Sequence, residues 1–132
     1  MAGSQLWWRF FILPIVLAAP AAVAADQPQA QPVTVIATEY QFSPNKLTFK
    51  RGVAYRLHVE NHGKETHEFA APAFFKAVEL GDAAALNADK TEIVIHPGET
   101  KELDFIARKP GRYSLRCSDH DWAGMTGQIS VK

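Results

Sequence analysis

The sequence predicts an all-β domain in which two sheets pack face to face as a sandwich. Three observations predict this class: short segments alternate apolar and polar residues, turn residues separate them closely, and few stretches are long enough for a regular helix. Successive side chains of a strand point to opposite faces of the sheet, so alternating apolar and polar residues place the apolar ones on a single face. That face is expected to be buried. A chain of 132 residues is the length of one domain, so both sheets would share one core.

About seven strands are expected, and each ends in turn residues. In the clearest, residues 53–60, valine, tyrosine, leucine and valine alternate with small or polar residues. Turns at Arg51-Gly52, Pro97-Gly98 and Pro110-Gly111 separate successive segments. The expected strands are 33–37, 47–50, 53–60, 91–95, 102–107, 113–117 and 128–132.

Residues 72–90 break this pattern and are expected to form an excursion that contains a short helix. The stretch holds Phe74 and Phe75, followed by the alanine-rich piece 82–86. Adjacent aromatic side chains in such a connection usually pack, so we expect them to cover one end of the core.

Residues 1–25 have the features of a secretory signal peptide. Arg9 is their only charge, an apolar stretch covers residues 10–17, and small residues follow, so cleavage is expected after Ala24 or Ala25. A retained membrane anchor is the alternative, but the charge-free segment after Arg9 contains Pro14 and Pro20, and its alanine-rich end suits a signal peptidase better than a bilayer.

Residues 26–32, rich in Gln, Pro and Ala, are expected to be a flexible leader, and the domain to occupy residues 33–132. The whole chain has 14 basic residues, 14 acidic residues and one cysteine. A chain without basic excess has no electrostatic footprint for nucleic acid, and one cysteine cannot form an internal disulfide. These counts argue against a nucleic-acid binder and against a disulfide-stapled miniprotein.

One loop near the C-terminus carries three metal-binding side chains within nine residues. Cys117, His120 and Met125 are spaced Cys-x2-His-x4-Met between two expected strands. Thiolate, imidazole and thioether are soft or borderline donors. His67, at the start of an upstream apolar segment, is a second imidazole that a strand pair can bring near. Together they are the donor set of a copper site that carries one electron.

The same residues allow other interpretations. Zinc is disfavoured because methionine is a poor zinc ligand and structural zinc sites use four Cys or His donors. The alternative without a metal is that Cys117 is a buried and inert residue. Metal ligation is favoured because a free, exposed thiol in an exported protein would be prone to oxidation, and a bound metal explains why this single cysteine is tolerated. His62 is an alternative to His67 as ligand, whereas His58 and His96 are expected to be solvated.

The sequence Tyr-Ser-Leu-Arg-Cys-Ser-Asp-His at 113–120, followed by Gly-Met-Thr-Gly at 124–127, resembles the ligand loop of cupredoxins, especially plastocyanin and pseudoazurin. The resemblance covers essentially residues 33–132. It implies a Greek-key β-sandwich, periplasmic in bacteria, that holds one copper ion. In this chain, the family's ligands correspond to His67, Cys117, His120 and Met125.

Two residues depart from the plastocyanin pattern. Glu68 replaces the usual asparagine, and the resulting His-Glu-Phe resembles small exported cupredoxin-like proteins of copper tolerance or iron uptake. Glu68 is expected to hydrogen-bond to Ser118 or Thr126, with direct metal ligation as the alternative. Asp119 replaces a proline and offers an N–H to the Cys117 sulfur, which predicts a potential above that of Asp119→Pro.

The leading functional prediction is a periplasmic electron carrier, with no enzymatic activity, that cycles between Cu(I) and Cu(II). Its partner would be a redox protein such as a c-type cytochrome or an oxidase. His120 would face that partner, and Trp122 either lines the docking surface or packs in the loop. After signal cleavage the protein is expected to be monomeric, bound neither to membrane nor to nucleic acid.

Two other functions use the same ligands. One is copper tolerance or homeostasis, or an accessory role in iron uptake. The other is an enzymatic or subunit copper domain, in which Glu68 and an open coordination position would act on a small molecule. The sequence shows no additional His-x-His pairs for the second copper site that this requires.

Overall fold

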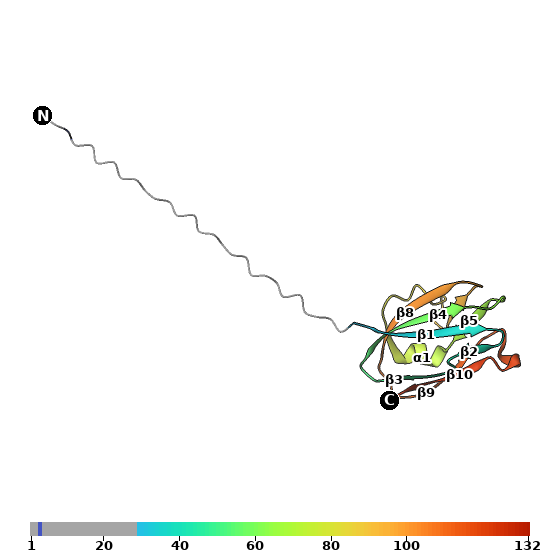
Figure 1. Ribbon diagram of the computed structural model, residues 1–132. Coiled ribbons are helices and arrows are strands. Elements are labelled where there is room, and N and C mark those ends of the chain that lie inside the picture. Colours follow the sequence, from blue (N-terminus) through green and yellow to red (C-terminus); the bar gives the residue numbers. More distant parts are fainter. Residues whose placement is uncertain (1–2, 4–28) are drawn as a thin grey trace.

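Two five-stranded sheets face each other in the computed structural model, which describes residue 3 and residues 29–132 (Figure 1). The predicted signal peptide, apart from Gly3, and leader residues 26–28 lie outside the described residues. The first sheet has the order β2 (Gln41–Ser43), β1 (Gln31–Thr38), β4 (Ala54–Asn61), β8 (Thr100–Ala107), β6 (Val78–Leu80). The second has the order β3 (Lys46–Phe49), β10 (Thr126–Val131), β9 (Gly111–Arg116), β5 (His67–Ala70), β7 (Glu92–Ile95).

Each sheet contains one parallel pair among antiparallel ones. β1 runs parallel to β4, and β3 runs parallel to β10. The alternation expected in β4 is confirmed, since Tyr55, Leu57 and Val59 are buried and Arg56 is exposed. Leu57 lies opposite Leu103 of β8, so the inward-facing side chains of neighbouring strands meet in one core.

The predicted all-β sandwich is confirmed, but it has ten strands where about seven were expected. β2 and β6 have three residues each, too few for alternation to show in the sequence. β5 is buried at all four positions, so it has no alternation at all.

The first strand begins two residues before the predicted start at residue 33. Gln31 and Pro32 of the expected leader belong to β1, where they pair with Tyr55 and Arg56 of β4. Proline is tolerated there because β2 pairs with β1 only from Ile36 onward, so among the described strands none pairs with the other edge of β1 at Pro32.

The expected helix of the 72–90 excursion is α1, Pro72–Ala77. Proline at the start of a helix costs no hydrogen bond, because the first N–H groups have no partner within the helix. α1 buries Phe74 and Phe75 against the core as expected, whereas the alanine-rich piece 82–86 contains a turn and no helix. Among the described residues, no helix has the length and apolarity needed to span a bilayer.

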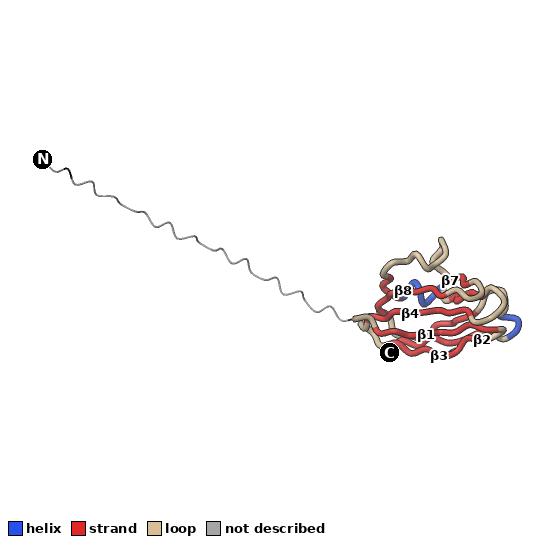
Figure 2. The backbone as a smooth tube through the Cα atoms, turned by 45° about the horizontal axis from the view of Figure 1, so that its top comes forward, coloured by secondary structure: helices blue, strands red, loops and turns tan. Residues whose placement is uncertain are grey.

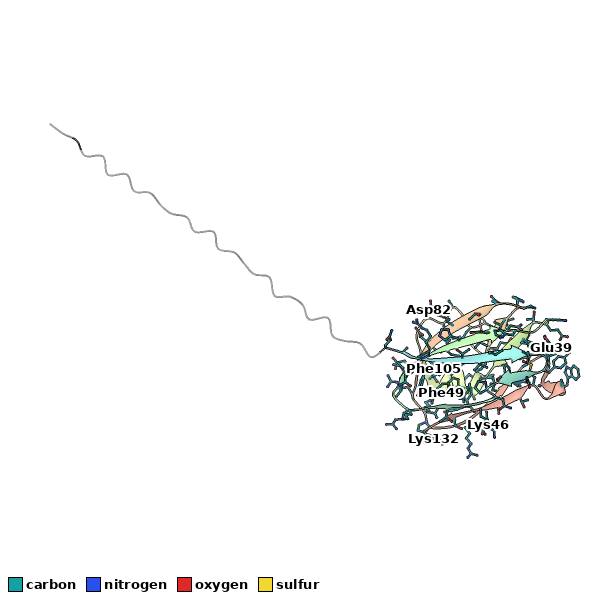
Figure 3. The ribbon with its side chains drawn as sticks, in the orientation of Figure 1. Glu39, Lys46, Phe49, Asp82, Phe105 and Lys132 are labelled. Atoms are coloured by element: carbon teal, nitrogen blue, oxygen red, sulfur yellow. The ribbon has the colours of Figure 1, made fainter. Side chains whose placement is uncertain are left out.

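The aromatic core is centred on Phe49. Its ring centroid lies 4.8 Å from that of Tyr55, 5.0 Å from Phe105 and 5.7 Å from Phe74. Phe49 and Phe105 lie within the sandwich, while Glu39 lies at its far end (Figure 3). The C-terminal residue Lys132 lies at the end of the sandwich opposite Glu39 (Figure 3). The second short helix, η1 (Asp121–Ala123), lies at the Glu39 end, beyond β2 (Figure 2).

Replacing Phe49 by alanine is expected to lower the free energy of unfolding by about 3–5 kcal/mol, because it removes a buried ring in contact with three others. Urea denaturation of the metal-free protein measures this change. Trp122→Ala removes a large aromatic ring that is 76% exposed and should change the same quantity by less than about 1 kcal/mol. Equal losses in the two variants would contradict a core centred on Phe49.

Candidate metal centre

The four predicted donors come from β5 and from the loop between β9 and β10. His67 is the first residue of β5, and Cys117 directly follows β9. One residue pair, Ala70 with Arg116, joins β5 to β9 and sets His67 beside the loop. The structure therefore brings an upstream strand to the Cys-x2-His-x4-Met segment, as the sequence analysis expected.

The loop is closed by its own backbone. The Cys117 N–H donates to the Met125 carbonyl at 3.0 Å, and the His120 N–H donates to the Cys117 carbonyl at 3.3 Å. Between His120 and Met125, η1 is followed by its C-cap residue Gly124. The φ of Gly124 is 82°, a left-handed conformation that glycine adopts without strain. These bonds hold Cys117, His120 and Met125 at one end of the second sheet.

Three donor atoms are already assembled in this protein. The Cys117 Sγ lies 3.9 Å from His67 Nδ1 and 3.4 Å from His120 Nδ1, and the three atoms lie within 4.8 Å of one another. His67, Cys117 and Met125 are buried, while the His120 side chain is 13% exposed. The centre is thus an enclosed donor cluster with one imidazole edge at the surface.

The thiol is strongly influenced by its surroundings. Burial raises the pKa of Cys117 to about 11, because the thiolate loses its solvation. The backbone N–H of Glu68 donates to the sulfur at 3.4 Å and partly offsets this increase in pKa. The thiol donates to the Glu68 Oε2 at 3.0 Å.

The prediction that Glu68 hydrogen-bonds to Ser118 or Thr126 is wrong. Glu68 is only 6% exposed, and its Oε2 accepts from the Cys117 thiol and, at 3.3 Å, from the Asp119 N–H. Ser118 Oγ instead donates at 2.7 Å to Glu92 of β7, the strand on the other side of β5. Glu68 therefore joins the strand to the ligand loop through the sulfur.

The Asp119 N–H donates to Glu68 Oε2 at 3.3 Å and also acts on the Cys117 sulfur. The N–H still stabilises the thiolate and lowers the pKa of Cys117, although burial outweighs it. Any effect of Asp119→Pro on potential would therefore pass through Glu68 as well as through the sulfur.

Two acidic residues that the sequence analysis missed lie behind the imidazoles. Glu39 Oε1 is 3.1 Å from His67 Nε2, and Glu65 Oε2 is 2.8 Å from His120 Nε2. Glu39 is 28 residues from its histidine in the sequence, so no local motif could indicate the contact.

The remaining histidines lie outside the cluster. His62 is exposed and pairs with Glu60 at 2.8 Å, so it does not replace His67. His58 pairs with Glu102 at 2.8 Å, and the exposed His96 contacts Thr66 at 3.1 Å. Within the part of the chain that the structure describes, His67, Cys117 and His120 form the one group of three or more such side chains that could hold a metal.

Comparison with known proteins places the fold and the centre in one family. A family model described as a cupredoxin-like domain matches residues 9–131. The chain belongs to the cupredoxin-like family. The match covers nearly the whole sequence and confirms the resemblance drawn from the ligand loop.

The sequence relatives of this cupredoxin include plastocyanins. It is 37% identical over 51 residues to the plastocyanin minor isoform of Arabidopsis thaliana, which is 39% of this chain and 29% of that protein. It is 36% identical over 50 residues to the plastocyanin of Mercurialis perennis, which is 38% of this chain and 48% of that protein. The match thus spans less than half of either relative.

Solved structures share the fold. Auracyanin B superposes with a TM-score of 0.58 at 21% identity, covering 81% of this chain and 92% of that one. The periplasmic domain of cytochrome oxidase subunit II of Bradyrhizobium japonicum gives 0.56 at 20%, covering 80% and 86%. A multi-copper oxidase from Pediococcus acidilactici gives 0.58 at 17%, covering 94% and 30%. At these identities, the likeness concerns the fold alone.

The donor set fits one copper ion. Two imidazole nitrogens and a thiolate sulfur are the strong ligands of a one-electron copper site, and a buried thioether follows at Met125. A structural zinc site would need four Cys or His donors, and this cluster has three. Family and donor chemistry together confirm the predicted copper cofactor.

In the metal-free protein, iodoacetamide should modify Cys117 at least about 100-fold more slowly at pH 8 than it modifies a cysteine peptide, because a pKa of about 11 leaves little thiolate. The rate should rise about tenfold per pH unit between pH 8 and 10. Cys117 is the only cysteine, so mass spectrometry follows it without ambiguity. Urea-unfolded protein, as control, should react like the peptide. A rate that levels off by pH 9 would contradict the raised pKa.

Proposed function

We propose that this cupredoxin is a periplasmic protein that carries single electrons between redox partners, with His67, Cys117, His120 and Met125 as copper ligands. The preassembled cluster of the first three carries the proposal. When bound, copper supplies a Cu(I)/Cu(II) couple. Side chains that are already in place need to move little when the charge of the metal changes, and small reorganisation favours fast electron transfer.

His120 is the proposed route for the electron. Its side chain is the only exposed one among the four proposed ligands. The Tyr40 ring lies 4.9 Å from the His120 ring and 5.8 Å from that of Trp122. Trp122 is the exposed large apolar residue of the described chain, and its Nε1 donates to the Asp119 carbonyl at 2.9 Å. This arrangement supports docking of a partner over His120.

The partner we propose is another redox protein, such as a c-type cytochrome or an oxidase. A cupredoxin fold within a cytochrome oxidase subunit is consistent with that chemistry. Export to the periplasm is supported by the signal-like residues 1–25. A non-enzymatic role is supported by the burial of three of the four proposed ligands, which leaves a substrate little access to the metal.

Copper tolerance is the second candidate, and Glu68 favours it. A carboxylate oxygen 3.0 Å from the sulfur adds negative charge beside the metal position and would favour Cu(II) over Cu(I). A strong preference for one oxidation state suits holding copper better than cycling it. The two functions share every proposed ligand, so electron exchange must be measured directly.

Adding one equivalent of Cu(II) to the purified protein should produce an intense visible sulfur-to-copper charge-transfer band that Cys117→Ala abolishes. His62→Ala, the matched control at a histidine outside the cluster, should keep the band. Glu68→Gln should keep it too, because we assign Glu68 to the sulfur and the loop and not to the metal. Weak absorption that is the same in wild type and Cys117→Ala would overturn the copper–thiolate site.

Trp122→Ala should slow oxidation of the reduced copper protein by a c-type cytochrome by about fivefold or more, because exposed tryptophans often dominate docking energy. Stopped-flow mixing measures the second-order rate constant, and the visible band should be unchanged. Lys132→Ala, at the opposite end of the domain, is the control (Figure 3). Tight copper binding without measurable electron exchange in the wild type would favour copper tolerance instead.

A further inference from the structure

Each of the two clustered imidazoles has one nitrogen facing the sulfur and the other facing a carboxylate. For His67, Nδ1 lies 3.9 Å from Cys117 Sγ and Nε2 lies 3.1 Å from Glu39. For His120, the corresponding distances are 3.4 Å to the sulfur and 2.8 Å to Glu65. Neither carboxylate belongs to the ligand motif, and each comes from a turn or loop outside it.

We propose that Glu39 and Glu65 are positioning residues of the copper site, an inference that rests on the ligands assigned under the proposed function. A neutral imidazole has a single N–H, and a carboxylate partner requires that proton on Nε2. Nδ1 then keeps its lone pair free on the side of the sulfur. Hydrogen bonding to a carboxylate also makes the ring a stronger donor to the metal.

Glu39 is held by the backbone of a neighbouring loop. The same Oε1 that faces His67 accepts from the N–H groups of Lys64 at 2.7 Å and Glu65 at 2.9 Å. These two bonds fix the carboxylate of Glu39 against the 64–65 backbone, with the same oxygen directed at the imidazole. Gly63 permits the approach, because a Cβ at that position would overlap the Glu39 carboxylate.

Glu65 is oriented by a different set of contacts. Its Oε1 accepts from the Tyr40 hydroxyl at 3.2 Å, while its Oε2 faces His120. Its backbone carbonyl accepts from the buried Asn61 side chain at 2.7 Å, which anchors the loop to the end of β4. Glu39 and Tyr40 are neighbours in the turn between β1 and β2, so this turn supports both imidazoles without supplying a ligand.

Nitrogen-15 NMR of the metal-free protein tests the inference without copper. Both His67 and His120 should carry the proton on Nε2 and leave Nδ1 free. Protonation of Nδ1 in the neutral form of either ring would overturn the positioning role of its carboxylate. The NMR measurement does not depend on copper binding. If the wild-type protein fails to show the sulfur-to-copper band, that result overturns the proposed function alone, and the NMR measurement still decides the positioning role of the carboxylates.

Copper binding provides the second readout. Glu39→Gln and Glu65→Gln should each weaken Cu(II) binding by roughly tenfold. Because Cu(I) binding should be less affected than Cu(II) binding, the reduction potential of the copper couple should rise. A tenfold loss of Cu(II) affinity corresponds to a rise of at most about 59 mV. Glu102→Gln is the control, because Glu102 pairs with His58 at the same 2.8 Å but away from the cluster.

The variants are chosen to separate positioning from folding. Glutamine keeps an oxygen that can still accept from the 64–65 backbone, and the Glu65 side chain has no backbone partner among its described bonds. Urea unfolding of the metal-free variants verifies that each is folded. Affinity and potential equal to those of Glu102→Gln in both folded variants would overturn the inference.

Discussion

The burial of one sulfur atom between β5 and the 117–125 loop is the constraint on which the rest of the centre depends. Cys117 has no exposed surface, and burial alone disfavours its thiolate. A soft metal cation removes that penalty, because the thiolate is then neutralised within the protein. The N–H of Glu68 and the Nδ1 atoms of two histidines already surround the sulfur.

The aromatic core and the donor cluster occupy different parts of the sandwich along its length. Phe49 and its aromatic neighbours fill the interior, while Glu39 lies at the far end (Figure 3). The ligand loop extends from strands that this core packs together, so the loop need not stabilise the domain by itself. Polar groups at the metal end are satisfied by one another, and none of the buried side-chain N or O atoms of the described residues is without a hydrogen-bond partner.

Three carboxylates lie around the donor cluster. Glu68 touches the sulfur, while Glu39 and Glu65 lie behind the imidazoles. Negative charge at all three places favours the more highly charged ion, Cu(II). The pattern therefore bears on the balance between carrying electrons and holding copper, which the ligands alone do not decide.

Alternation and turn residues were sufficient for the all-β class, since β4 and β8 are long and buried on one face. They were not sufficient for β2, β6 and β5. The first two are too short to show a period, and β5 is buried on both faces. A strand of that kind is recognisable only from the strands that pair with it.

The sequence by itself determined the metal and the ligand loop, because Cys117, His120 and Met125 lie within nine residues and one closed loop brings them together. Tertiary structure decided which upstream histidine joins them. His67 begins a buried strand beside the loop, whereas His62 points to solvent. Only the tertiary structure placed Glu39 behind His67 and Glu68 on the sulfur, because these partners are 28 and 49 residues apart in the sequence and meet through sheet packing.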